Sequence, residues 1–132
     1  MIRIRPASRM LLALALGFPL LVAAGCGGSA AARPVDEDAA RRALSEALEA
    51  WKGGEPHGAL SKRPSPIRVA DEDWLAGSRL LSYRVEPGDE QIGTNLTCDV
   101  VLTLKAPNGR KAKKRVSYRI GTDPVPMVIR QD

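Results

Sequence analysis

Histidine, cysteine and aromatic residues are scarce in this sequence of 132 residues. It contains one histidine, His57, and two cysteines, and aromatic side chains make up 4% of it. A catalytic base needs a partner that orients it, and none lies near His57 at local spacing, so we expect an exposed loop residue. Two cysteines allow at most one disulfide. The sequence therefore predicts no catalytic residue, no metal site and no cofactor.

A hydrophobic run long enough to cross a membrane is also missing. The longest apolar stretch covers residues 10–24 and is interrupted by Gly17 and Pro19. A membrane-spanning helix needs about 20 consecutive apolar residues. This stretch follows Arg3, Arg5 and Arg9 and ends in small residues, which is the layout of an export signal. We therefore expect residues 1–25 to be a signal peptide, with an uncleaved helix as an alternative.

The residues at the end of this signal resemble the lipobox of bacterial lipoproteins. Cys26 directly follows three small residues at positions 23–25. The resemblance implies that the thiol of Cys26 receives a diacylglycerol and that Cys26 becomes the first residue of the mature chain. Gly27 is not the aspartate that retains enteric lipoproteins in the inner membrane. By analogy, we expect a lipid anchor in the cell envelope, with the outer membrane preferred.

An ordinary secretory signal is the alternative, because residues 22–24 also fit a signal-peptidase site. The protein would then be soluble, either secreted or periplasmic, and Cys26 could form a disulfide with Cys98. A lipid on Cys26 would exclude that disulfide. Residues 26–33 are expected to be a flexible tether, whose seven residues after Cys26 reach at most roughly 25 Å.

Charge of one sign does not dominate the chain that would remain after cleavage. Residues 26–132 carry 17 basic and 15 acidic side chains, which is a net charge of +2. So small an excess gives no support to a nucleic-acid partner, which an exported protein would rarely meet. Residues 34–132 have the size of one small domain.

An amphipathic helix is predicted over residues 34–52. Asp36 is a candidate N-cap, and the two acidic residues that follow it suit the positive end of the helix dipole. Apolar residues then recur at spacings of three and four, which defines one buried face. The members of this face are Ala40, Ala43, Leu44, Ala47, Leu48 and Trp51. Gly53 and Gly54 end the helix, and residues 53–66 are expected to be an irregular loop.

From residue 79 onward the apolar pattern changes to a period of two, which predicts β-strands. We expect strands at residues 79–85, 95–105, 115–120 and 127–130, with an Asn-Gly turn within residues 107–109. The apolar face comprises Leu81, Tyr83 and Val85, then Leu96, Cys98, Val100, Leu102 and Leu104, then Val116, Tyr118 and Ile120. The fold class is therefore α+β, with one N-terminal helix packed on a four-stranded antiparallel meander sheet. Residues 67–69 would make it five-stranded.

A resemblance to a known family rests on residues 47–54, 74–77 and 128–130. Their order, with alternating strands between them, resembles the small cystatin-like domains of the nuclear-transport-factor-like superfamily, which occur in exported lipoproteins of planctomycete type. Enzymatic members hold acid and base residues in a cone closed by several helices. One helix is predicted here, so the resemblance carries over no catalytic residue. We expect Trp51 and Trp74 to cap the two ends of the core.

Three further polar features are expected to be structural. Cys98 lies mid-strand on the apolar face, which predicts a buried thiol. Asp99 lies on the opposite face and is expected to be a solvated strand charge. Asp71, Glu72 and Asp73 are expected to form a solvated turn, because consecutive carboxylates diverge and lack the spacing of a calcium loop.

The strongest charge cluster directly follows the predicted hairpin turn. Its members are Arg110, Lys111, Lys113, Lys114 and Arg115. One interpretation is a solvated hairpin whose lysines protect a sheet edge, and the other is contact with anionic lipid or an acidic envelope polymer. The sequence thus predicts a membrane-tethered envelope lipoprotein with a non-catalytic interaction or structural domain. A small-ligand-binding or enzymatic domain, with a pocket between helix and sheet, is the alternative.

Overall fold

The computed structural model describes residues 34–132, so the predicted signal peptide, Cys26 and the tether lie outside the described residues. The chain forms α1 (Glu37–Lys52), a short 3-10 helix η1 (Ala59–Lys62), β1 (Arg68–Ala70), α2 (Glu72–Leu75), β2 (Arg79–Val85), β3 (Glu90–Ile92), β4 (Asn95–Lys105), β5 (Lys111–Gly121) and β6 (Met127–Gln131). None of the helices within residues 34–132 has the length and apolar character needed to cross a membrane.

Helix α1 begins where the sequence predicts it. Asp36 has an extended backbone, and its carboxylate accepts a hydrogen bond from the N–H of Ala39 at 3.0 Å. This bond satisfies one of the free N–H groups of the first turn. All six predicted apolar positions are buried. The helix ends at Gly53, and Gly54 follows with a φ of 85°, a conformation that glycine adopts without a steric penalty.

The strands form a mixed sheet in the order β1-β6-β5-β4-β2, and β3 pairs with the other half of β4. The predicted α+β class and the four predicted strands are confirmed. The prediction of a purely antiparallel meander was wrong, because β1 runs parallel to β6. Two adjacent parallel strands need a long connection. Here the connection from β1 to β6 contains α2 and all the strands between them. The C-terminal strand therefore returns beside the first one.

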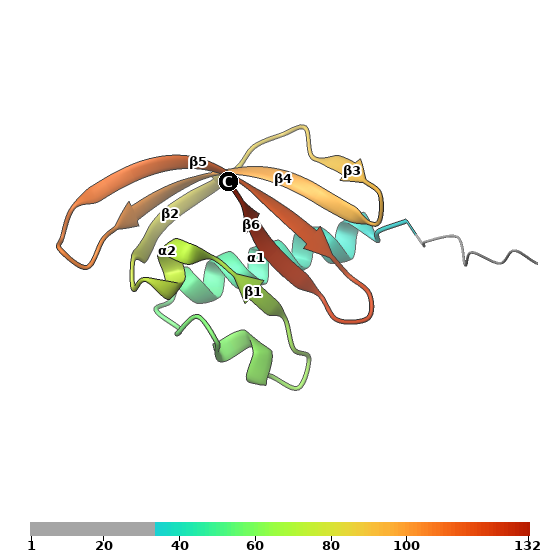
Figure 1. Cartoon of the computed structure of the whole chain (residues 1–132), viewed down its shortest axis with the longest axis horizontal. Coiled ribbons are helices and arrows are strands. Elements are labelled where there is room, and N and C mark those ends of the chain that lie inside the picture. Colours follow the sequence, from blue (N-terminus) through green and yellow to red (C-terminus); the bar gives the residue numbers. More distant parts are fainter. Residues whose placement is uncertain (1–33) are drawn as a thin grey trace, which may run out of the picture.

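The sheet curves around α1 (Figure 1). Along β4 and the second half of β5, buried and less buried side chains alternate, as the period of two predicts, whereas residues 111–115 are all exposed. The buried members are Leu96, Cys98, Val100, Leu102 and Leu104 of β4, and Val116, Tyr118 and Ile120 of β5. The β4–β5 turn lies at one end of the long axis of the molecule, and the residues just before α1 lie at the other (Figure 1).

Strand β2 departs from the predicted apolar face. Leu80 is buried, whereas Leu81 is 37% exposed. The pairing of β2 with β4 shifts between Leu80 and Ser82, which marks a β-bulge that inserts one residue. By register Tyr83 and Val85 lie on the predicted face, although Val85 is 40% exposed at the sheet edge. The prediction was wrong for Leu81, because Leu80 takes its place in the core.

The two tryptophans lie together rather than at two ends of the core, so that prediction was also wrong. Their rings stack with centroids 5.4 Å apart and planes 8° apart. The indole N–H of Trp51 donates to the carbonyl of Ser78 at 2.8 Å, and that of Trp74 donates to the carbonyl of Glu55 at 2.9 Å. The predicted irregular loop contains η1, whose Leu60 is fully buried. The loop therefore folds back and brings α2 onto the end of α1.

Candidate functional site

The predicted basic cluster lies on the β4–β5 turn and the first half of β5. Lys114 Nζ lies 3.1 Å from Asp73 Oδ2, and Arg115 Nη2 lies 3.1 Å from Asp99 Oδ2. The three other members, at positions 110, 111 and 113, are exposed and form no ion pair within residues 34–132. Two of the five cationic groups are thus neutralised by carboxylates of this chain, and three are available to an external anion.

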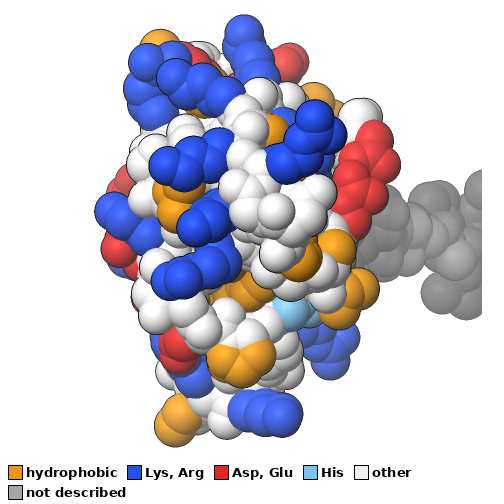
Figure 2. All heavy atoms as spheres, turned by 90° about the vertical axis from the view of Figure 1, so that its left-hand side faces the viewer, with side chains coloured by type: hydrophobic (Ala, Val, Ile, Leu, Met, Phe, Trp, Pro, Cys, Tyr) orange, Lys and Arg blue, Asp and Glu red, His pale blue; other side chains and the backbone are white. Residues whose placement is uncertain are grey.

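Basic side chains also face one another across three strands. Arg79 of β2 lies opposite Lys105 of β4, and Lys105 lies opposite Lys111 of β5. All three are exposed, and none takes part in an ion pair in the described part of the chain. Like charges directly opposite each other destabilise a sheet. Folding therefore does not explain this row, and lysine and arginine side chains gather at this end of the molecule (Figure 2).

Lys105 and Arg79 belong to this basic face, although the sequence analysis did not select them. Lys105 flanks the Asn-Gly turn, so the hairpin register alone could have paired it with Lys111. The position of Arg79 depends on the β2–β4 pairing, which the local pattern does not specify. We call the exposed cationic residues Arg79, Lys105, Arg110, Lys111 and Lys113 the basic end.

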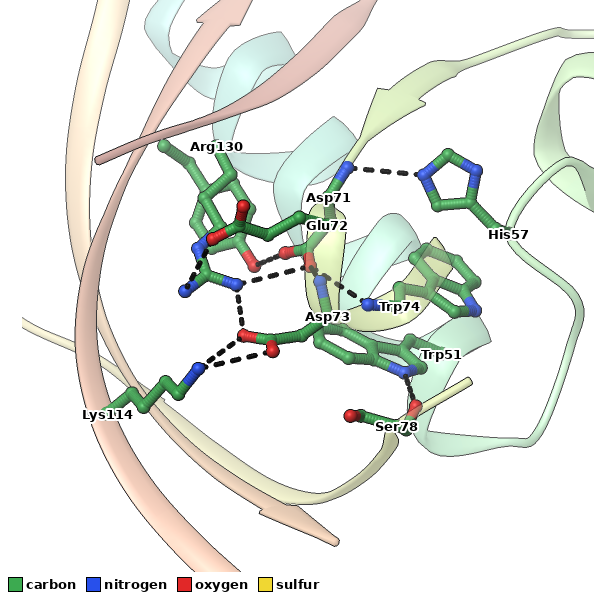
Figure 3. Close-up of polar contacts among 10 residues, drawn as sticks. Trp51, His57, Asp71, Glu72, Asp73, Trp74, Ser78, Lys114 and Arg130 are labelled. Carbon is green, nitrogen blue, oxygen red and sulfur yellow. Dashed lines mark hydrogen bonds and ion pairs between the residues drawn. The ribbon is translucent and has the colours of Figure 1, made fainter. Parts of the chain in front are cut away.

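The acidic turn is anchored to the sheet, so the prediction of a solvated turn was wrong (Figure 3). Asp71 is 3% exposed. Its Oδ1 caps α2 by accepting the N–H groups of Asp73 at 2.9 Å and Trp74 at 3.1 Å. The hydroxyl of Tyr118 on β5 donates to its other oxygen at 2.5 Å. A buried carboxylate needs such partners, because burying an isolated charge is costly.

Arg130 of β6 connects these carboxylates to the far strand (Figure 3). Its Nη1 hydrogen-bonds to Asp73 and lies 3.4 Å from Asp71 Oδ1, and its Nη2 lies 3.7 Å from Glu72 Oε1. The side chain is 8% exposed. Its Nε is buried without a hydrogen-bond partner in the described chain. Together with Lys114, Arg130 fixes α2 to β5 and β6.

The electrostatics of this cluster favour a structural role. Burial alone would raise the pKa of Asp73, but hydrogen bonds from Arg130 and Lys114 outweigh burial and hold that pKa below its usual range. Burial, followed by the nearby charge of Asp71, raises the pKa of Tyr118 far above its ordinary value. Asp73 therefore stays ionised and Tyr118 stays protonated near neutral pH. Neither group is suited to transfer a proton there.

His57 is half-buried rather than exposed, which corrects the sequence prediction. Its Nε2 accepts a hydrogen bond from the backbone N–H of Asp71 at 3.2 Å, and its ring meets Trp74 edge-on at a centroid distance of 5.5 Å. It lines an open groove of about 460 Å³ together with Trp51, Leu75 and neighbouring loop residues. The groove lies at the loop and α2, outside the space between α1 and the sheet. His57 has no carboxylate hydrogen-bonded to it in the described structure.

Asp99 lies on the outer face of β4, as predicted. It accepts hydrogen bonds from the hydroxyl of Ser117 at 2.5 Å and from Arg115 at 3.1 Å. These bonds, with that from Ser117 the larger cause, lower the pKa of Asp99. In the described part of the chain, Asp99 does not line the groove beside His57.

Cys98 is buried on the core face of β4, as predicted. Burial is the main cause that raises the pKa of its thiol, to about 11. A protonated and enclosed thiol is a poor nucleophile. A disulfide between Cys98 and Cys26 would require part of this core to open.

The chemical capacity of the site is that of a cationic surface. Within residues 34–132 no three histidine, cysteine, aspartate or glutamate side chains are grouped to hold a metal ion. In the described chain, the exposed cationic side chains of the basic end form no ion pair and are available to bind an external anion. Comparison of the chain with protein-family models, with curated proteins and with solved structures finds no match.

Proposed function

We propose that this protein is an exported, membrane-anchored lipoprotein whose non-catalytic domain binds an anionic component of the cell envelope through the basic end. The observation that carries the proposal is the like-charged row of Arg79, Lys105 and Lys111. This row opposes folding, and an anion bound across it would remove the repulsion. The cystatin-like character of the domain is part of the same proposal.

The anchor in this proposal is the lipid on Cys26. Two acyl chains give stable membrane attachment, because each buried CH₂ contributes about 0.8 kcal/mol. The burial of Cys98 supports lipidation over a disulfide, since Cys98 lies in a closed core. The outer membrane is the preferred location, and a secreted or periplasmic soluble protein is the alternative.

The position of the residues just before α1 favours a partner beyond the anchoring bilayer. The basic end and the residues just before α1 lie at opposite ends of the long axis (Figure 1). A tether of roughly 25 Å at most would then attach at one end of the domain, so the opposite end would on average lie farther from the membrane. An anionic envelope polymer or an acidic protein fits this arrangement better than the headgroups of the same membrane.

Intact mass of the membrane-extracted protein tests the anchor. We expect the loss of residues 1–25 and the addition of a diacylglycerol, and we expect Cys26→Ser to abolish both changes. A chain cleaved within residues 22–25 without added lipid would contradict lipidation and support the secretory alternative.

Binding to polyphosphate and to phosphatidylglycerol vesicles, at low and at moderate salt, tests the basic end. The chain with Arg110, Lys111 and Lys113 replaced by Gln should bind polyphosphate at least tenfold more weakly. This variant keeps Lys114 and Arg115, whose ion pairs are structural. The matched control replaces the exposed residues Arg42, Lys52 and Lys62 by Gln. Equal loss in both variants, or no loss in either, would contradict a specific role of the basic end.

A small-ligand or enzymatic domain is the alternative proposal. It needs a pocket between helix and sheet, of several hundred Å³. That space is occupied by fully buried side chains from both layers, which are Leu44, Leu48, Val100, Leu102 and Tyr118. The groove beside His57 is an open surface feature. These observations support the non-catalytic proposal over the alternative.

A further inference from the structure

Strand β5 has an unpaired edge at the basic end. It pairs with β4 along its length, from Lys111 to Ile120, but with β6 only from Ser117 to Gly121. Residues 111–116 therefore have no strand on the β6 side within the described chain. In Figure 1 the β4–β5 hairpin extends well past the end of β6.

The hairpin geometry identifies the free backbone groups of this edge. The N–H of Ala106 donates to the carbonyl of Arg110 at 2.8 Å, which closes the turn. In an antiparallel pair, hydrogen-bonded residues alternate along the strand. The N–H and C=O groups of Lys111, Lys113 and Arg115 consequently point away from β4. They face the open edge, where no strand of residues 34–132 takes them up.

Space for an additional strand exists along this edge. A groove of about 410 Å³ is lined by residues 114–117 of β5 and by Arg130, Gln131 and Asp132. It begins where β6 ends, so a strand lying there would continue the line of β6. The face of the molecule that contains this end of the sheet carries many lysine and arginine side chains (Figure 2).

We propose that the edge of β5 from Lys111 to Arg115 binds an extended acidic polypeptide segment as an added β-strand. The inference rests on the proposed function and names the partner of the basic end. Backbone groups of the edge would bond to the segment, and its carboxylates would lie beside the outward lysines and arginines. A lipid surface or a polysaccharide would use the charges alone. Lysines on an edge disfavour neutral and basic strands, so they select an acidic one.

Two peptides of equal charge test this proposal on the full chain in a non-ionic detergent. One alternates Thr and Glu over eight residues, and the other is the same sequence with a methylated backbone nitrogen at each Glu. These are the N–H groups that face β5 when Glu lies opposite Lys111 and Lys113 in an antiparallel pair, so the second peptide cannot donate the same backbone hydrogen bonds. Both carry a fluorescent label for anisotropy measurements. We expect the Thr-Glu peptide to bind at least tenfold more tightly. Equal affinity of the two peptides would overturn the proposal.

A matched pair of variants isolates one backbone donor. Lys113→Gln and Lys113→Pro remove the same charge, but only the second removes the N–H group that faces the edge. Binding of the Thr-Glu peptide should fall severalfold further in Lys113→Pro, and thermal unfolding of both variants reports whether they fold. Hydrogen exchange on the unmodified chain is the second readout. The amides of Lys111, Lys113 and Arg115 should exchange more slowly when the peptide is bound, and unchanged exchange would overturn strand addition.

The outcomes separate this inference from the proposed function. If both peptides bind equally and salt abolishes binding, the anionic-partner function holds and strand addition is wrong. If neither peptide binds but polyphosphate or phosphatidylglycerol vesicles do, the partner is a polymer or a lipid and strand addition is wrong. If none of these probes binds, both proposals are wrong.

Discussion

Asp71 joins three parts of the molecule through a single carboxylate. One oxygen caps α2, the other accepts the hydroxyl of Tyr118 on β5, and Arg130 of β6 lies beside them. A buried pair of this kind adds little net stability compared with apolar side chains, but removal of one partner leaves the other charge without compensation. The short helix that carries Trp74 is therefore attached to the sheet through Asp71 and through the ion pairs of Asp73 with Lys114 and Arg130.

Asp71→Ala should reduce the free energy of unfolding by about 3 kcal/mol, because Arg130 and Tyr118 would lose a buried acceptor. Urea unfolding followed by circular dichroism measures the change. Glu72→Ala is the control, since its side chain is 65% exposed, and we expect a change within about 0.5 kcal/mol. Similar values for the two variants would contradict the anchoring role of Asp71.

Asp73 gives the fold a dependence on acid pH. Its pKa is lowered in the folded state, so its stabilisation is present above the unfolded pKa of about 3.9 and is lost as pH falls through the folded value. At neutral pH Asp73→Asn should cost about 2 kcal/mol. The difference from the unmodified chain should shrink as pH falls below about 4. Glu46→Gln, at an exposed position of α1, should show no such convergence.

Cys98 should react slowly with a thiol reagent in the folded protein. Its burial and its pKa of about 11 both suppress the thiolate. Labelling by a maleimide at neutral pH, with and without urea, measures the effect. We expect a rate at least a hundredfold higher in urea. Fast labelling without urea would show that the core around β4 opens readily.

At the residue scale, the sequence predicts which face of a strand a side chain lies on, but it does not predict which distant residues that side chain contacts. The burial of Cys98 and the outward position of Asp99 follow from the alternation along one strand. The burial of Asp71 does not, because its partners Tyr118 and Arg130 are 47 and 59 residues away. One feature of the sequence pointed to Arg130 as a partner of a buried carboxylate, because it is a cation at the end of the short apolar strand that begins at Met127.

At the scale of the element, the β4–β5 hairpin combines the most regular pairing with the highest positive charge. Its two strands pair over ten consecutive positions. The turn is closed by the N–H of Gly109, which donates to the carbonyl of Ala106 at 2.8 Å, and Gly109 has a φ of 85°. Since this turn sets the register, it also sets which lysines face outward.

Gly109→Ala should destabilise the protein by about 1–2 kcal/mol, because a side chain at this φ meets the following carbonyl. Gly58→Ala is a matched control. Gly58 has a φ of −88°, and no atom lies within 4 Å of an added Cβ, so the change should be neutral or slightly stabilising. Thermal unfolding of the two variants measures the contrast. Equal effects would indicate that the turn geometry does not limit stability.

Elements with long regular patterns were predictable, and elements set by pairing partners were not. Helix α1, β4 and the second half of β5 follow from repeated apolar spacing, whereas residues 111–114 were not predicted to be part of a strand. The bulge in β2 escaped prediction because Leu80 and Leu81 are both apolar, so the pattern does not show which one enters the core. The parallel direction of β1 is set by its place beside β6, and three residues carry no signal of direction.

At the scale of the whole molecule, charge is distributed unevenly although its net value is small. The acidic groups of Asp73 and Asp99 are occupied by Lys114 and Arg115. The basic end has no equivalent partners in the described chain. Residues 26–132 carry a nearly balanced net charge of +2, and that value gave no indication of the cationic surface.

Lys105→Glu should stabilise the fold while it weakens anion binding. A carboxylate between Arg79 and Lys111 turns two repulsive neighbours into attractive ones, and we expect a gain of about 0.5 kcal/mol. Polyphosphate binding should fall by at least tenfold. Lys62→Glu changes the net charge equally outside the sheet and should have a smaller effect on both measurements. A loss of stability in Lys105→Glu would contradict the like-charge row.

The overall arrangement could be predicted only in part. One helix against one sheet follows from the single amphipathic helix, because the apolar sheet face has no other layer to cover it. The folded-back loop does not follow, since it depends on Leu60, Trp51 and Trp74 meeting across a stretch rich in glycine and proline.

The stacked tryptophans have a consequence for spectroscopy. Trp51 and Trp74 are the two tryptophans of the chain, and their parallel rings lie close enough to couple electronically. Tryptophan fluorescence and the tryptophan bands of near-ultraviolet dichroism will therefore report on one corner, where α2 meets the end of α1. Detachment of that corner would change both signals. Events at the β4–β5 turn would be silent, so a ligand at the basic end has to be followed with a label of its own.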